Sequence, residues 1–189
     1  LAEALNDRIP RLSVRFYEAT SVAQMEALAV ERLDIGLMRP VEGVETFETM
    51  TVMRENFSVA IPVHHPLAQR RRFEIGLLDN EPLIGFSSDA PYLRGLLNEI
   101  FRQAGVKPRI VQEFAQSQAV LSLVSAGLGL AVLPEGTSSA SFDNVVFRPL
   151  RIDGHRGKGH HVDLIAVWKS ETRNPARAQV LDIPRSFPT

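Results

Sequence analysis

The chain has 189 residues, which suits one large domain or two small lobes. Hydrophobic residues make up 44% of it, enough for a packed core and far above the composition of a disordered chain. The 21 Lys and Arg residues are balanced by 22 Asp and Glu residues, so the overall charge argues against nucleic-acid binding by this chain itself.

Several classes of protein are excluded by what the sequence lacks. Without Cys there are no disulfides, thiolate metal sites or Cys nucleophiles, which is compatible with a reducing cytosol. No apolar run approaches the roughly 20 residues that span a bilayer, and residues 1–8 contain acids instead of the apolar stretch of a signal peptide. We therefore expect a cytoplasmic protein with no membrane partner. Because no initiator Met precedes Leu1, we expect a piece of a longer polypeptide or a chain trimmed to its ordered part.

The first block of predicted elements begins with residues 1–8, the end of a helix. Residues 12–17 alternate between apolar and polar side chains, the period of a strand. A helix is predicted over residues 22–32, because Val, Met and Leu side chains recur on one face. Residues 33–38 and 57–63 are short apolar runs typical of buried strands.

The same alternation restarts after residue 81. A short strand at residues 83–86 is followed by the most strongly amphipathic helix of the chain, at residues 93–104. A strand at residues 109–114, a helix at residues 117–126 and a buried strand at residues 130–133 follow. The order of strand and helix favours a second α/β block.

The closing segment contains two more strands, at residues 145–150 and 162–168, and a short helix at residues 176–182. The glycine-rich residues 153–159 form an exposed loop. Strands alternating with helices predict parallel sheets covered by helices. Because no helix precedes the apolar strand at residues 164–168, we expect it to cross back to the first block. Two lobes joined by two crossings leave a cleft in which ligands bind.

Neither the two histidine pairs nor the glycine pair Gly127-Leu128-Gly129 indicates a catalytic site. His64-His65 and His160-His161 could suggest a metal, but adjacent side chains on a strand point in different directions, and a turn or surface role is the alternative. No Gly-x-Ser-x-Gly motif or phosphate loop is present. We therefore expect no cofactor, no metal and no enzymatic activity.

Polar residues recur between predicted strands and predicted helices, at Thr20-Ser21, Ser87-Ser88 and Ser117-Gln118. Helix N-termini carry free N–H groups and partial positive charge, which suits carboxylates or phosphates. Simple N-capping is the alternative for each pair. Together, the three pairs favour a site for a small anionic molecule.

Four stretches of the sequence carry a family resemblance by their order and spacing. They are residues 18–40, residues 54–62 running into 65–68, residues 81–86, and residues 123–134. In this order they resemble the ligand-sensing domain of LysR-type bacterial transcriptional regulators.

The resemblance implies an α/β fold with two Rossmann-like lobes joined by two crossover strands, like type II periplasmic binding proteins. Lobe I would comprise residues 1–81 plus 162–189, and lobe II residues 82–161. Family members have a strand before the first helix of the domain. The present chain opens inside that helix, so the first strand is missing. The N-terminal winged helix-turn-helix DNA-binding domain is also absent from this chain.

The resemblance also implies partners and a mechanism. These are a small-molecule effector, a homodimer or tetramer, promoter DNA bound only through the missing N-terminal domain, and RNA polymerase for the full-length protein. Helices at residues 21–31 and 91–104 would pair between subunits. The effector would favour a closed arrangement of the lobes, with hinges near residues 80–83 and 156–162.

By position, the resemblance assigns the effector site to ten residues: Thr20, Ser21, Met38, Arg39, Pro40, Ser87, Ser88, Phe114, Ser117 and Gln118. Arg39 is the candidate partner for the carboxylate of a small acid, because its planar guanidinium matches one. A surface ion pair is the alternative for Arg39. A solute-binding protein serving a transporter is the alternative function, and an enzyme on this fold is the third.

Overall fold

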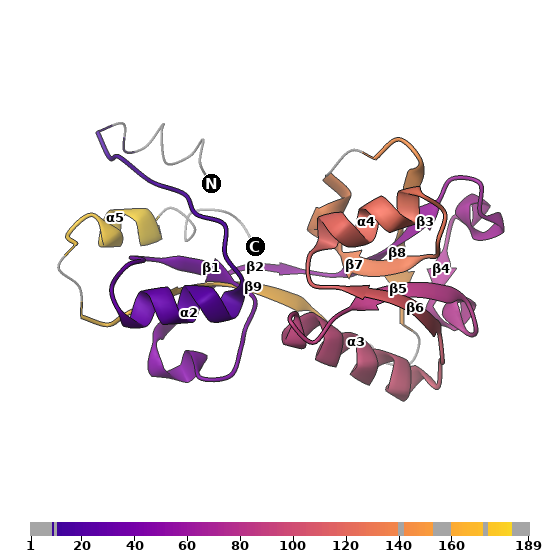
Figure 1. Ribbon diagram of the computed structural model, residues 1–189, viewed down its shortest axis with the longest axis horizontal. Helices are drawn as coiled ribbons and strands as arrows, with labels where there is room; N and C mark the ends of the chain where they lie inside the picture. The colour runs from indigo at the N-terminus through magenta and orange to yellow at the C-terminus, as the bar shows by residue number, and fades with distance from the viewer. Residues whose placement is uncertain (1–8, 10, 140–141, 153–159, 172–173, 183–189) are drawn as a thin grey trace. The chain divides into compact units, whose positions relative to one another are not determined.

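The computed structural model describes residues 9, 11–139, 142–152, 160–171 and 174–182. The chain divides into two compact units (Figure 1). Unit 1 comprises Leu1–Arg54 and Asp163–Thr189, and unit 2 comprises Glu55–Val162. The chain thus passes between the units after Arg54 and again after Val162, whereas the sequence analysis placed the first boundary at residue 81. The predicted helix end at residues 1–8 and the predicted loop at residues 153–159 lie outside the described residues.

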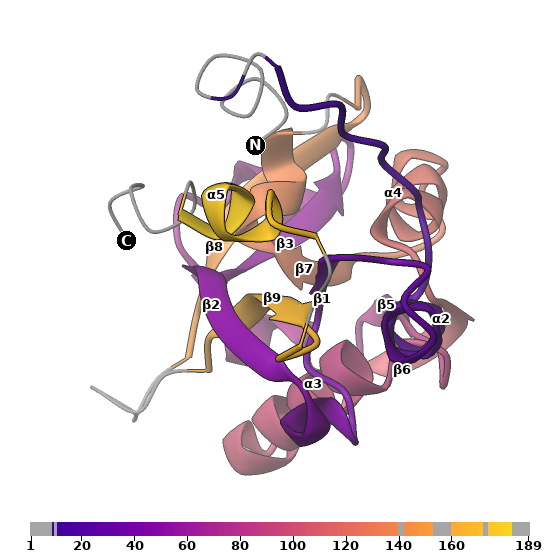
Figure 2. The same ribbon diagram turned by 90° about the vertical axis from the view of Figure 1, so that its left-hand side faces the viewer.

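Unit 1 is built on a three-stranded sheet in the order β1-β9-β2 (Figure 2). Its strands are β1 (Gly36–Met38), β9 (Val162–Trp168) and β2 (Glu48–Glu55). The closing strand β9 returns to unit 1 as predicted and becomes the central strand. It pairs with β1 in antiparallel register, Gly36 opposite Val167. Strand β2 was not predicted, because most of its side chains are exposed and the apolar alternation is weak.

Two α-helices and one 3-10 helix accompany this sheet: α2 (Ser21–Ala29), α5 (Arg177–Asp182) and η1 (Val44–Thr46). Helix α2 ends three residues before the predicted end, where Glu31 adopts a positive φ of 58°. The buried core that α2 shares with the sheet is small. Its buried members are Leu28, Met38, Ile165 and Val167.

The strand predicted at residues 12–17 is wrong. These residues form no strand or bridge, and Phe16 and Tyr17 are 63% and 68% exposed. Alternation of side chains reports only which positions could face a core, whereas a strand also needs a neighbouring backbone for its hydrogen bonds. Within the described residues, no segment supplies that backbone.

Unit 2 contains a four-stranded sheet in the order β4-β8-β3-β7 and the parallel pair β5-β6. The strands are β3 (Phe57–Pro62), β4 (Phe73–Glu74), β5 (Pro82–Phe86), β6 (Arg109–Phe114), β7 (Ala131–Pro134) and β8 (Val145–Arg151). A bridge between Leu83 and Leu130 connects β5 to the start of β7.

The pairing of β3 explains the shifted boundary. Strand β3 is hydrogen-bonded to both β7 and β8, so residues 57–62 belong to unit 2. Both of these pairings, and that of β1 with β9, are antiparallel, which corrects the expectation of parallel sheets. Among the described residues, the β5-β6 pair, the short β4-β8 pair and the bridge between Leu83 and Leu130 are parallel.

Helices α3 (Pro91–Ala104) and α4 (Ser117–Ser125) lie on opposite sides of the unit 2 strands (Figure 1). Both are followed closely by a glycine with positive φ, Gly105 at 65° and Gly127 at 80°. Three 3-10 helices complete the unit: η2 (Pro66–Gln69), η3 (Ile75–Leu78) and η4 (Glu135–Ser139). Its buried core is much larger than that of unit 1 and includes Phe73 and Leu121.

Candidate functional site

In unit 2, the structure brings predicted site residues together where the parallel strands β5 and β6 end. Ser87 follows β5 and Phe114 is the last residue of β6. The N–H of Ser87 donates to the carbonyl of Phe114 at 3.1 Å. Ser87 also accepts a hydrogen bond at its Oγ from the N–H of Asp89, at 3.4 Å. The carboxyl ends of parallel strands are where α/β proteins bind ligands.

Helix α4 begins at the same end of β6. Ser117 is its first residue and is half-buried, and Gln118 is exposed. The preceding residue, Gln116, makes no side-chain cap hydrogen bond, so the free N–H groups of this nine-residue helix are not capped by it. This helix start therefore offers backbone donors and partial positive charge to an anion.

Ser87 and Ser88 do not begin a helix, which corrects one expectation. Helix α3 begins four residues after Ser87, at Pro91, and its N-cap is Ala90. The N–H of Ala90 donates to the carbonyl of Ser87 at 3.0 Å, which closes a turn. The two serines occupy this turn after β5.

In unit 1, Thr20 is the N-cap of α2. Its Oγ1 accepts a hydrogen bond from the N–H of Ala23 at 3.3 Å. Thr20 thus performs the capping role that the sequence left open, and Ser21 is the first helical residue.

The remaining predicted residues of unit 1 lie at the end of β1. Met38 is 2% exposed, and its side chain packs in the core with Leu28 and Val167. Arg39 and Pro40 follow, both half-buried. The core position of Met38 fixes the direction in which the chain leaves β1.

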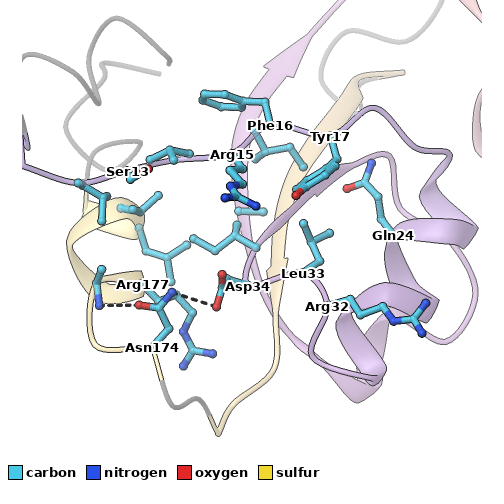
Figure 3. A pocket seen from close by; sticks show the side chains of 18 residues that line it. Ser13, Arg15, Phe16, Tyr17, Gln24, Arg32, Leu33, Asp34, Asn174 and Arg177 are labelled. Carbon is cyan, nitrogen blue, oxygen red and sulfur yellow. Dashed lines mark hydrogen bonds between the residues drawn. The ribbon is translucent and has the colours of Figure 1, made fainter.

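A pocket in unit 1 was missed by the sequence analysis (Figure 3). Its volume is about 430 Å³. Residues 12–17 form one wall, and residues 32–35 with Leu37 form another. The third wall comes from α5 and the segment before it, where Asn174 donates to Asp34 at 3.0 Å. The unpaired alternation at residues 12–17 was the sequence signal that could have indicated it.

The C-terminal wall of this pocket is fixed by Arg177. Its guanidinium donates to the carbonyls of Lys169 and Ser170, at the end of β9. Two hydrogen bonds from Arg177 to backbone carbonyls, and one from the Asn174 amide to the Asp34 carboxylate, thus hold α5 near the sheet. The pocket wall is therefore a built part of unit 1.

Histidine and acidic residues do not gather into a metal site within the described residues, where no group of three or more His, Cys, Asp or Glu is placed to hold an ion. His65 is the N-cap of η2: its Nδ1 accepts from the N–H of Leu67 at 3.3 Å. Its Nε2 lies 3.7 Å from a carboxylate oxygen of Glu81. These contacts fit the turn role that the sequence left open for the pair.

The largest electrostatic perturbation lies on the surface of α3, away from the predicted site residues. Hydrogen bonds from Arg102 and Gln103 lower the pKa of Glu99 to about 2.

Within the described residues, no helix is long and apolar enough to cross a bilayer.

A family model and the sequences of known proteins both match this chain. Residues 1–183 match the family described as the LysR substrate binding domain. The HTH-type transcriptional regulator TtuA of Agrobacterium vitis is 32% identical over 185 residues, covering 97% of this chain and 60% of TtuA. The chain therefore spans less than two thirds of that relative.

Solved structures give the same fold. The BenM effector binding domain with its effector benzoate matches with a TM-score of 0.80 at 24% identity, covering 97% of this chain and 82% of that one. The effector binding domain of QuiR in complex with shikimate matches with a TM-score of 0.79 at 19% identity, covering 97% and 87%. The type II periplasmic-binding-protein-like α/β fold expected from the sequence is thus confirmed, and the chain belongs to the LysR substrate-binding-domain family.

Proposed function

We propose that this chain is the ligand-sensing part of a LysR-type transcriptional regulator and that its effector is a small carboxylic acid. The observation that carries the proposal is the end of the β5-β6 pair, where the start of α4 offers free backbone donors. Two relatives of this fold hold benzoate and shikimate, and both molecules are carboxylic acids.

The proposed effector contacts are those that the family resemblance assigns. The N-terminus of α4, with Ser117 and Gln118, binds the carboxylate through N–H and side-chain donors. Ser87 and Ser88 add hydroxyl groups, and Phe114 adds an apolar surface. Unit 1 contributes the remaining five predicted residues: Thr20, Ser21, Met38, Arg39 and Pro40. Because the side chain of Met38 is buried, its contribution is through the backbone.

Effector binding shifts the population between arrangements of the two units, by the difference of its affinity for them. The hinge belongs where the chain passes between units, at Arg54–Glu55 and Val162–Asp163. The earlier expectation of a hinge at residues 80–83 does not fit, because those residues lie inside unit 2. There the N–H of Asn80 donates to the carbonyl of Lys107 at 3.1 Å.

The whole regulator binds promoter DNA through an N-terminal winged helix-turn-helix domain and assembles as a homodimer or tetramer. Subunits pair through the outer surfaces of α2 and α3, and RNA polymerase is a further partner. Such a protein acts in the cytoplasm and catalyses no reaction. A solute-binding protein of similar fold is the weaker candidate, since the named relative is a transcriptional regulator.

Thermal denaturation of the chain with a panel of aromatic and alicyclic carboxylic acids tests the proposed function. An acid at 100 times its dissociation constant should add about 2.7 kcal/mol of stability. The shift should shrink in Ser117→Ala and Arg39→Gln, and persist in the control Ser138→Ala, an exposed serine of η4. A panel without any selective stabilisation, or an equal loss in all three variants, would contradict the proposal.

A further inference from the structure

Five arginines of unit 2, here named the arginine patch, gather beside the β4-β8 pair. They are Arg70, Arg71, Arg72, Arg148 and Arg151. The first three connect η2 to β4. Arg151 lies opposite Glu74 in the parallel pairing of β8 with β4. Arg148 reaches the connecting segment, where its guanidinium donates to the carbonyls of Arg70 at 2.9 Å and Ala68 at 2.8 Å. Segments nearly 80 positions apart in the sequence thus lie side by side.

The backbone that carries the patch is anchored at both ends. Ala68, before the three consecutive arginines, is 3% exposed, and Phe73, after them, is fully buried. The guanidinium of Arg148 holds the carbonyls between these anchors. The exposed arginines therefore project from a fixed turn, and binding through them orders side chains but little backbone.

No carboxylate neutralises this patch within the described part of the chain. Arg70–Arg72 and Arg151 make no ion pair there, whereas Arg54 and Arg94 each face a carboxylate. Glu74 lies opposite Arg151 in the β4-β8 pairing, but its carboxylate forms no ion pair with an arginine of the patch among the described residues. Its buried Oε2 has no hydrogen-bond partner among the described residues. In a chain of net charge −1, this surface is a local excess of positive charge, and its self-repulsion falls when an anion binds.

We propose that the arginine patch contacts the phosphate backbone of duplex DNA next to the site held by the regulator's DNA-binding domain. The inference rests on the proposed function, because only then is DNA held close to this chain. Guanidinium groups match phosphate oxygens in a bidentate geometry. A tethered duplex has a high effective concentration, so a contact that is weak in isolation contributes to binding. The contact positions DNA without reading its sequence.

DNA fits this surface better than an acidic protein does. Protein interfaces centre on apolar or aromatic anchors. The large apolar side chains that are exposed lie elsewhere: Val14, Phe16, Tyr17, Val22, Val30, Met53, Ile110, Phe114 and Leu128. None of them belongs to the η2–β4 segment or to β8. A positively charged surface without an apolar centre is typical of a phosphate-binding surface.

The test is fluorescence anisotropy of the chain with a short labelled duplex of arbitrary sequence, across salt concentrations. The logarithm of the binding constant should fall linearly with the logarithm of salt concentration, by about 0.9 per phosphate contacted. The triple variant R70Q/R71Q/R72Q should reduce that slope by about 2.7. R70K/R71K/R72K should retain the slope, because the charges remain.

The matched control is R15Q/R32Q/R109Q, which removes the same charge from three exposed arginines elsewhere. Its slope should equal that of the unaltered chain, and circular dichroism checks that each variant folds. Equal losses in the two glutamine variants would overturn the proposal. So would binding to polyglutamate with none to the duplex in low salt. The thermal-shift response to carboxylic acids should be unchanged in the patch variants, so failure here is distinguishable from failure of the proposed function.

Discussion

The guanidinium of Arg54 and the carboxylate of Asp163 meet in two hydrogen bonds, Nε to Oδ1 at 2.7 Å and the second guanidinium nitrogen to Oδ2 at 3.1 Å. Arg54 is the last residue of unit 1 before the chain enters unit 2, and Asp163 is the first after it returns. One bidentate pair therefore joins the two passages of the chain, 109 residues apart in sequence.

Breaking this pair should have a small effect on stability. The two side chains are 57% and 25% exposed, so water screens their attraction. Arg54→Gln and Asp163→Asn should each lower the free energy of unfolding, with a coupling of about 0.2–1 kcal/mol in the double-mutant cycle measured by urea denaturation. A coupling of zero would mean that the pair is not maintained in solution. The exposed ion pair between Arg94 and Glu113 serves as the control, measured by the same double-mutant cycle.

Gly129 should not tolerate a side chain. A Cβ at this position would lie 2.7 Å from the carbonyl oxygen of Pro82, which accepts the hydrogen bond from Leu130 N–H. Gly129→Ala should therefore separate β5 from the start of β7 and destabilise the chain by about 1–3 kcal/mol. In contrast, Gly95→Ala in the interior of α3 meets no atom within 4 Å and should stabilise by about 0.5–1 kcal/mol. Chemical denaturation of both variants measures the contrast, and equal effects would contradict it.

The acidity of Glu99 should depend on Arg102. Hydrogen bonds from Arg102 and then Gln103 lower the pKa of Glu99 from 4.5 to about 2. The contribution to stability is present above pH 4.5 and is lost as the pH falls through about 2. Arg102→Gln should move the pKa back toward 4.5, followed by NMR titration of the side-chain carboxyl. An unchanged pKa would show that the hydrogen bond is absent in solution.

Substitutions of Thr20 should separate its two roles. Thr20→Ala removes the cap of α2 and should lower stability by about 0.5–2 kcal/mol, whereas Thr20→Asn preserves a capping oxygen and should restore it. If Thr20 acts only as a cap, Thr20→Asn will bind effectors like the unaltered chain. Weaker binding with restored stability, measured by calorimetry, identifies an effector contact.

Helices were the most predictable part of the fold because their signals are local. The apolar stripe of α3 and the polar start of α4 depend on neighbouring residues only, and the structure confirmed both helices. Strands depend on distant partners. The alternation of apolar and polar side chains at residues 12–17 predicted a strand, but these residues pair with no other strand in the described structure. Strand β2 does pair in a sheet, although its sequence shows little such alternation.

The local structure around the proposed site residues was predictable only in part. Sequence order placed Ser117 at a helix start, but the hydrogen bond that joins Ser87 to Phe114 depends on the register of β5 against β6. It also could not foresee that Met38 packs inward, because an apolar residue at a strand end can face either side. The arginine patch depends on the β4-β8 pairing, which no local pattern contains.

The small core of unit 1 has a thermodynamic consequence for sensing. The buried core cluster of unit 1 is smaller than that of unit 2, so the amides of unit 1 should exchange with solvent through local opening at lower free energy. An effector that contacts unit 1 then orders it while binding. Its calorimetric signature should include a negative heat-capacity change larger than contact with the ligand alone would produce. Part of the binding free energy of such an effector is therefore used to order unit 1.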